Sequence, residues 1–122
     1  MNDQRQFVRK TLSTQVTLFD KHTQQYTGFM VDYSDGGIMM ACYQPLEVQK
    51  TYEFIMMDLP NNIGRKRMGH VTLNSVWCKQ ISPTQFGVGF MLVEMDEGAK
   101  TMFASYDAEF SAQQGEQQYG SG

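Results

Sequence analysis

Residues 25–42 read QYTGFMVDYSDGGIMMAC, in which the run Asp32-Tyr33-Ser34-Asp35-Gly36-Gly37 separates two apolar segments. Asp and Ser side chains fold back onto nearby backbone N–H groups, and glycine tolerates positive φ, so this run is typical of a tight turn. The apolar segments on either side have the composition of strands. The stretch therefore predicts two strands joined by a turn.

Short alternating segments bounded by turn residues continue along the chain and predict further strands. The predicted strands run from Leu12 to Leu18, from about Gln25 to Val31, from Ile38 to Cys42, from Thr51 to Leu59, from Arg67 to Lys79 and from Phe86 to Leu92. Helical patterns between them are missing, which argues against βαβ units. The expected fold is an all-β body of six short strands, an antiparallel barrel or sandwich.

Glycines have distinct positions in the last two predicted strands. Gly69 marks a bulge in the fifth strand. Gly87 and Gly89 share one face of the sixth strand, which allows another element to approach closely. The alternation of the fifth strand places Trp77 on the same face as Val71 and Leu73, which favours a core tryptophan over one exposed for stacking.

A single helical pattern follows Asp96, a suitable N-cap. Its apolar residues recur at helical spacing and form one stripe, made of Ala99, Met102, Phe103, Tyr106 and Phe110. Residues 111–122 lack apolar periodicity and are predicted to be a disordered tail. Residues 1–110 form the expected single domain, and within it residues 1–10 form a mobile arm.

Composition excludes several classes of protein. A chain of 122 residues buries a core without metal or disulfide staples. The N-terminus has no apolar leader and no apolar run approaches 18 residues, so we expect a cytoplasmic protein without membrane insertion. A net charge of −3 argues against DNA or RNA as the partner. Six of the ten basic residues nevertheless gather in two clusters, Arg5, Arg9, Lys10 and Arg65, Lys66, Arg67, which suit a small dianion.

Metal and catalytic sites are not expected. Cys42 and Cys78 lie far apart without a CxxC context and are predicted to be buried free thiols. His22 and His70 are isolated from them and from each other, so no metal-ligand spacing arises. Ser34 stands in DxSxxG rather than GxSxG and has no evident general base. We therefore expect no enzyme, no cofactor and no bound metal.

The segment Arg5-Gln6-Phe7-Val8-Arg9 precedes the first strand and completes an RxxxR motif. Together with the DxSxxG motif of Asp32, Ser34 and Gly37, it resembles the PilZ family of bacterial cyclic di-GMP receptors. The likeness extends to Phe86-Gly87-Val88-Gly89-Phe90 and the helix after it. It implies a split six-stranded antiparallel β-barrel with a C-terminal α-helix. Members often carry another arginine directly before RxxxR, where this chain has Gln4, and that position bears on ligand stoichiometry.

The resemblance implies a set of residues for binding cyclic di-GMP: Arg5, Arg9, Asp32, Ser34, Gly36 and Gly37, with Lys10 and Trp77 as additional candidates. Their chemistry suits this ligand, because a guanidinium bonds a phosphate or the O6/N7 edge of guanine and stacks on the base. On an extended arm, Arg5 and Arg9 are separated by at most about 14 Å. The carboxylate of Asp32 suits the N1–H and N2–H₂ donors of guanine, and adenine lacks that pair.

The leading hypothesis is a cyclic di-GMP receptor in which the ligand orders the arm against the DxSxxG turn and alters a surface read by a protein effector. A PilZ-like adaptor that acts without nucleotide is the alternative. An OB-like barrel that binds single-stranded nucleic acid is a third, and the acidic net charge argues against it.

Overall fold

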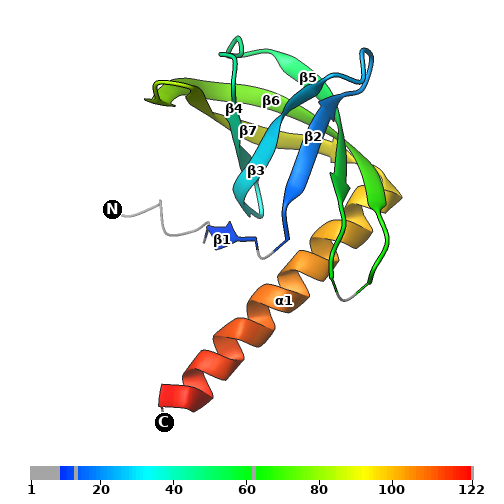
Figure 1. Cartoon of the computed structure of the whole chain (residues 1–122), viewed down its shortest axis with the longest axis vertical. Coiled ribbons are helices and arrows are strands. Elements are labelled where there is room, and N and C mark those ends of the chain that lie inside the picture. Colours follow the sequence, from blue (N-terminus) through cyan, green and yellow to red (C-terminus); the bar gives the residue numbers. More distant parts are fainter. Residues whose placement is uncertain (1–8, 13, 62, 122) are drawn as a thin grey trace.

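The computed structural model describes residues 9–12, 14–61 and 63–121, and the side chains among them up to residue 113. Strands dominate this part of the chain, and one long helix follows them (Figure 1). In sequence order the elements are β1 Lys10–Thr11, β2 Val16–Asp20, β3 Tyr26–Ser34, β4 Gly37–Cys42, β5 Thr51–Asp58, β6 Arg67–Ser82, β7 Gln85–Met95 and α1 Glu97–Ser121.

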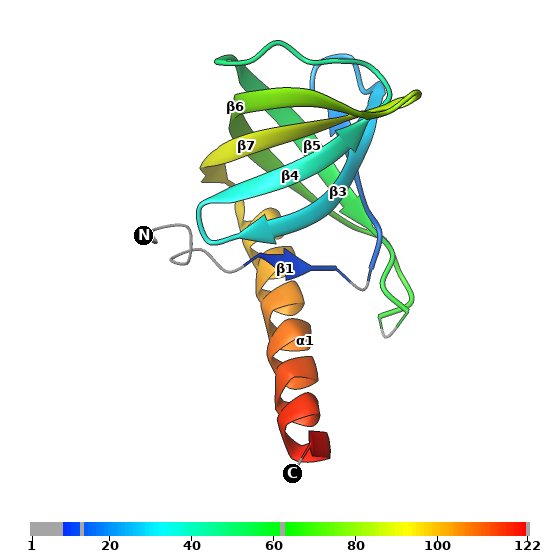
Figure 2. The same cartoon turned by 90° about the vertical axis from the view of Figure 1, so that its left-hand side faces the viewer.

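Six of the strands form a closed antiparallel barrel. Their order is β3-β2-β5-β6-β7-β4, and pairing of β3 with β4 closes the ring. The short strand β1 pairs with the end of β3, with Lys10 opposite Tyr33 and Thr11 opposite Asp32. Figure 2 shows β1 beside the β3–β4 hairpin and close to α1. The predicted six-stranded antiparallel barrel with a C-terminal helix is confirmed, with β1 as an added strand.

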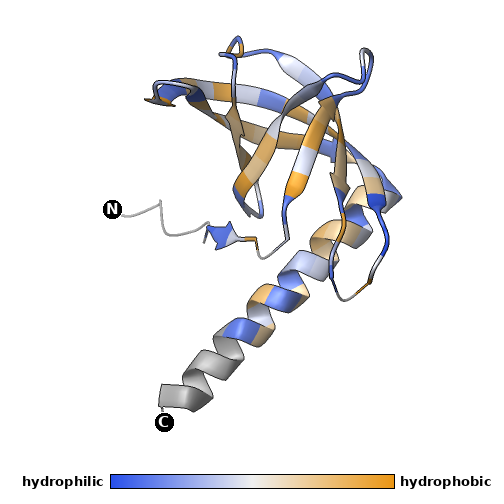
Figure 3. Cartoon of the chain, in the orientation of Figure 1, coloured by the Kyte–Doolittle hydropathy of each residue, from blue (hydrophilic) through white to orange (hydrophobic). Residues whose placement is uncertain are grey.

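Alternation of side chains along the strands forms the core. The inward positions of β2, β5, β6 and β7 are fully buried, as for Val16 and Leu18, Phe54 and Met56, Leu73 and Val88. Figure 3 shows apolar residues along the barrel strands and polar residues at several of the turns. Burial of this apolar surface is the main stabilising contribution, about 25 cal/mol per Å².

Helix α1 begins with a side-chain cap. Asp96 Oδ1 accepts a hydrogen bond from the backbone N–H of Ala99 at 2.9 Å, which confirms the predicted N-cap. The predicted stripe is confirmed for Ala99, Met102, Phe103 and Tyr106, which are buried against the barrel, whereas Phe110 is only half-buried and lies outside the core. Tight packing at this point requires Gly69, where a Cβ would overlap the Ala99 backbone.

Gly69 is therefore a helix-packing glycine and not the bulge that the sequence predicted. It pairs with Met56 in an unbroken register between β5 and β6. The register shifts of β6 lie against β7, between Thr72 and Leu73, between Ser75 and Trp77, and between Gln80 and Ser82. These bulges let a strand of 16 residues bend around the barrel.

The two ends of the predicted domain differ from the sequence-based boundaries. Lys10 belongs to β1 and not to a free arm, while the arm residues 1–8 lie outside the described residues. At the other end, α1 continues through Ser121, past residue 111 where a disordered tail was expected. Ala, Gln and Glu have high helix propensity, so a helix nucleated by packing continues along this segment. No helix in the described chain is both long and apolar enough to span a membrane.

Candidate functional site

A small hollow lies between the end of β1, the β3–β4 hairpin and the paired strands β6 and β7. Its volume is about 180 Å³. The structure brings five of the candidate residues to its wall, namely Arg9, Asp32, Ser34, Gly37 and Trp77. The remaining wall is apolar or backbone, with Ile38, Met39, Val76, Gly89 and Phe90. Residues of both the arm and the hairpin turn therefore converge on one concave surface.

Arg9 and Asp32 form the charged pair of this hollow. Arg9 Nη1 lies 3.8 Å from Asp32 Oδ2, with the Arg9 side chain 67% exposed and that of Asp32 only 16% exposed. Burial raises the pKa of Asp32, and the nearby Arg9 guanidinium lowers it in part. The 3.8 Å separation is too long for a hydrogen bond, so the carboxylate oxygens keep accepting capacity toward a guest.

The hairpin turn is fixed by close backbone packing. Ser34 pairs with Gly37 across the hairpin, and Gly37 pairs with Met91 of β7 on its other side. A Cβ at Gly37 would overlap the carbonyl oxygen of Phe90. The carbonyl oxygen of Gly36 accepts a hydrogen bond from Leu92 N–H at 3.1 Å.

The sequence-based account of the turn glycines needs a correction. Among the described residues, Gly64 is the glycine with positive φ, so neither Gly36 nor Gly37 uses the left-handed region. Gly37 is required by the approach of β7 and not by its backbone angle. Gly36 lies in the turn but not in the wall of the hollow.

Trp77 faces the hollow and not the barrel interior, so the core interpretation was wrong. Its partners across the sheet explain this, because Ser75 is opposite Phe90 while Trp77 is opposite Gly89, which leaves Val76 as an extra residue. The bulge shifts the alternation and turns Trp77 outward, where it is 37% exposed. Its indole covers Gly89 so closely that a Cβ there would overlap the ring nitrogen. The predicted close approach at the glycine face of β7 is confirmed.

Lys10 does not line the hollow but connects the arm to α1. Its Nζ donates a hydrogen bond to Asp107 Oδ1 at 2.9 Å and lies 3.6 Å from Asp35 Oδ1 of the turn. Tyr33 OH donates to the same Asp107 oxygen at 2.8 Å. The hydrogen bond to Asp107 raises the pKa of Lys10 despite partial desolvation. Burial raises and hydrogen bonding lowers the pKa of Asp107, with a net decrease.

Sequence reasoning missed Tyr33 and Asp107 as members of this network. A signal was present for Asp107, because it follows Phe103 by four residues and so lies beside the apolar stripe of α1. A carboxylate at that position indicates a polar partner on the facing element. Its partner Tyr33 is inside the DxSxxG motif, at a position that the motif leaves open.

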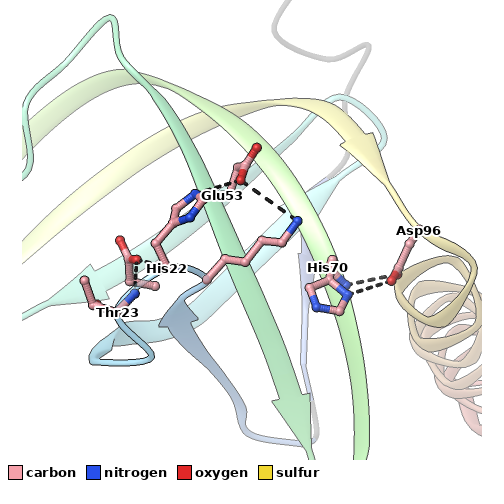
Figure 4. A network of polar contacts seen from close by, with 7 residues as sticks. His22, Thr23, Glu53, His70 and Asp96 are labelled. Atoms are coloured by element: carbon pink, nitrogen blue, oxygen red, sulfur yellow. Dashed lines mark hydrogen bonds and ion pairs between the residues drawn. The ribbon is translucent and has the colours of Figure 1, made fainter.

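The histidines pair with carboxylates outside the hollow (Figure 4). His22 Nε2 and Glu53 Oε1 are 2.8 Å apart, and His70 Nδ1 and Asp96 Oδ2 are also 2.8 Å apart. The backbone N–H of His70 donates to Asp96 Oδ1 at 2.9 Å, so this pair joins β6 to the start of α1. Within the ranges that the structure describes, no group of three or more metal-ligating side chains gathers.

The remaining residues singled out by the sequence are Arg5 and the two cysteines. Arg5 lies outside the described residues, so its position relative to the hollow is not assigned. Cys42 is a buried free thiol as predicted, and burial raises its pKa to about 11. Cys78 is only half-buried, against the prediction, and packs against the barrel core.

Comparison with known proteins agrees with this architecture. A solved structure of the Bacillus subtilis inhibitor of motility (MotI/DgrA) is similar to the chain, with a TM-score of 0.59 and 14% sequence identity. The similarity covers 89% of this chain and 52% of the other, so the chain spans about half of that protein and shares its fold. No curated protein matches the chain in a sequence search. A family model, that of the PilZ domain, matches residues 3–106. The chain therefore belongs to the PilZ domain family.

Proposed function

We propose that the protein is a cyclic di-GMP receptor, and that the hollow lined by Arg9, Asp32, Ser34, Gly37 and Trp77 holds part of the nucleotide. PilZ domains are a cyclic di-GMP-binding family that also contacts protein effectors. The described wall of the hollow offers cationic, anionic and aromatic groups on one concave surface. We propose a receptor and not an enzyme.

The observation that best supports this proposal is the burial of the Asp32 carboxylate and the distance to its partner. Its carboxylate is largely buried in the wall of the hollow and has a distant, exchangeable partner in Arg9 at 3.8 Å. A largely buried acceptor to which none of the described residues donates a close hydrogen bond favours a guest with donors. The N1–H and N2–H₂ groups of guanine provide two such donors, and Arg9 is then released toward a phosphate or the O6/N7 edge.

The volume of the hollow indicates which part of the ligand it holds and which part is left to the arm. Ligand pockets typically occupy about 300–1,000 Å³, and the hollow is about 180 Å³. It therefore takes one guanine and its neighbouring phosphate, with the indole of Trp77 as a stacking surface. The RxxxR segment, which includes Arg5, closes over the rest of the nucleotide.

The contacts of Lys10 give a route from the ligand to the rest of the molecule. Arg9, next to it, reaches the hollow, while Lys10 bonds Asp107 on α1 and approaches Asp35 in the turn. A ligand that holds Arg9 also holds β1 on β3, and thereby stabilises the Lys10–Asp107 contact. Such a ligand shifts the population only as far as it prefers the docked arm over the undocked one. A protein effector then reads the position of the arm and of α1.

Isothermal titration calorimetry with cyclic di-GMP tests the proposal. Replacement of Arg9 or Asp32 by alanine is expected to weaken binding by about 1–3 kcal/mol, or roughly 5- to 150-fold. Glu94→Ala is the matched control for Asp32→Ala, since Glu94 is an exposed carboxylate outside the wall of the hollow. Binding is also expected to weaken in acid, because burial raises the pKa of Asp32 and the protonated group loses accepting capacity.

Two results contradict the proposal. The first is wild-type protein that binds no cyclic di-GMP, which favours an adaptor acting without nucleotide. The second is equal affinity for cyclic di-AMP, because adenine lacks the paired donors that Asp32 is proposed to read.

A further inference from the structure

Two backbone hydrogen bonds form a turn in the loop between β5 and β6. The backbone N–H groups of Ile63 and Gly64 both donate to the carbonyl oxygen of Pro60, at 3.2 and 2.9 Å. Gly64 has a φ of 74°, a left-handed conformation that glycine adopts without strain. Glycine at position 64 therefore favours this turn.

A buried ion pair clamps the base of this loop. Arg67 donates from Nε and Nη2 to the two oxygens of Asp58, at 3.0 and 2.8 Å. Asp58 is only 3% exposed and also accepts a hydrogen bond from Tyr106 of α1. The base of the loop is thus attached to the helix as well as to the barrel.

Several residues on and beside this loop are exposed. Arg65 and Lys66 are exposed, and neither forms an ion pair with any residue of the described chain. Three large apolar side chains accompany them, with Leu59 56%, Ile63 38% and Met68 51% exposed. These five residues are named the basic loop surface below.

A shallow groove runs from the basic loop surface to the first turns of α1. Its volume is about 390 Å³ and its wall combines basic, apolar and small residues, namely Arg65, Lys66, Arg67, Met68, Gly98, Thr101 and Met102. Figure 1 shows the β5–β6 loop extending beyond the barrel alongside α1. The groove shares no residue with the wall of the nucleotide hollow.

We propose that this groove docks an acidic segment of a protein partner, with carboxylates at Arg65 and Lys66 and an apolar side chain against Met68. Charge complementarity supports the choice of partner, since Arg65 and Lys66 are exposed and form no ion pair with the described residues, on a chain of net charge −3. Exposed apolar residues rimmed by charge are typical of interaction sites. The proposal deepens the proposed function, because it names the chemistry of the effector, but the docking groove does not require nucleotide.

An anionic lipid surface is a poorer occupant than a peptide segment. Asp96 and Glu97 lie at the start of α1, next to the groove residue Gly98, and the Glu97 side chain is 91% exposed. A broad negative surface would meet these carboxylates together with the cations, whereas a short segment contacts the cations alone.

NMR with ¹⁵N-labelled full-length protein tests the proposal. The probe is a short synthetic peptide of alternating Glu and Leu, and a Lys/Leu peptide is its charge-reversed control. The expected result is saturable shifts of the amides at residues 64–68 and 98–102, weakened by added salt. The double variant Arg65→Glu, Lys66→Glu is expected to lose at least about tenfold in affinity. Lys79→Glu, which reverses an exposed cation outside the groove, is expected to bind as the wild type does.

Three outcomes overturn the proposal: shifts located elsewhere, equal binding of the Lys/Leu peptide, or peptide affinity unchanged in the double variant. Binding to phosphatidylglycerol vesicles without binding to the Glu/Leu peptide assigns the surface to a membrane instead. Concentration-dependent dimerisation that the double variant abolishes assigns it to a second copy. Calorimetry with cyclic di-GMP on the same double variant separates the two proposals, because nucleotide affinity is expected to stay unchanged when docking is lost.

Discussion

Lys10 and Asp107 are 97 positions apart in the sequence, and Lys10 Nζ donates a hydrogen bond of 2.9 Å to the Asp107 carboxylate. The contact joins β1, next to the proposed nucleotide site, to α1. Tyr33 OH donates to the same carboxylate at 2.8 Å, and the Tyr33 ring packs against those of Phe103 and Tyr106. Asp107 is therefore the point at which the arm, the hairpin and the helix meet.

Replacement of Asp107 by alanine is expected to lower the free energy of unfolding by about 1–3 kcal/mol, because the buried hydroxyl of Tyr33 loses its acceptor. Urea denaturation monitored by circular dichroism measures the change. Asp35→Ala is the control, since Asp35 is 81% exposed and its contact with Lys10 is longer, at 3.6 Å. Equal losses in the two variants would contradict a specific role for Asp107.

Loss of either partner of the buried Asp58–Arg67 pair is expected to lower the free energy of unfolding strongly. Asp58→Ala leaves the Arg67 guanidinium, whose side chain is 14% exposed, without its counter-ion, and is expected to cost about 3–5 kcal/mol. Tyr106→Phe removes a single hydrogen bond to Asp58 and is expected to cost less, about 1.5–3 kcal/mol. Chemical denaturation of both variants checks this order. A larger loss of stability in Tyr106→Phe than in Asp58→Ala would contradict it.

Gly89→Ala is expected to displace Trp77, because the added Cβ overlaps the indole nitrogen. Trp77 is the sole tryptophan, so its fluorescence emission reports the displacement directly. The matched control is Gly87→Ala, whose Cβ would meet the flexible end of Met39 at 3.0 Å and the Trp77 ring at an ordinary 3.5 Å. We expect a shifted emission maximum and weaker nucleotide binding in Gly89→Ala alone. Identical spectra for both variants would show that the ring does not depend on Gly89.

Asp96 is expected to make folding pH-dependent in acid. Hydrogen bonds from the backbone N–H groups of His70 and Ala99 lower the pKa of Asp96 to about 2. A depressed carboxyl pKa contributes stability above the ordinary value near 4, and this contribution is lost as the pH falls from about 4 toward 2. Since the side chain is 45% exposed, solvent screening reduces the effect to about 1 kcal/mol.

Asp96→Ala compared with the wild type measures this contribution. The stability difference is expected at pH 7 and should shrink as the pH falls from about 4 through 2, where Asp96 becomes protonated. Asp96→Asn retains an acceptor for the Ala99 N–H and is expected to recover part of the loss at pH 7. A difference that persists unchanged at pH 2 would assign the loss to packing instead.

Local patterns predicted most of the barrel. Alternation and turn residues placed the strands, the spacing from Ala99 to Tyr106 gave the inward face of α1, and Asp96 gave its cap. These features depend on neighbouring residues, so a single sequence contains them. The convergence of Arg9 with Asp32 was also expected, from the two motifs together.

Features that depend on cross-strand register were not predictable from the sequence. The bulge at Val76 moved Trp77 from the expected core face to the hollow, and no local pattern marks a bulge without glycine there. Gly69 was assigned to a bulge, whereas the approach of Ala99 from a distant helix explains it. The Lys10–Asp107 pair depends on the tertiary placement of α1, and the helix beyond residue 111 continues a packed segment that propensity alone does not fix.

The most direct test of the central claim is an NMR titration of ¹⁵N-labelled protein with cyclic di-GMP. The account predicts saturable shifts at the amides of Arg9 to Thr11 and of Asp32 to Gly37 and at the indole N–H of Trp77, with smaller shifts near Asp107. Saturable binding that leaves these resonances unchanged, or no binding at all, would contradict it.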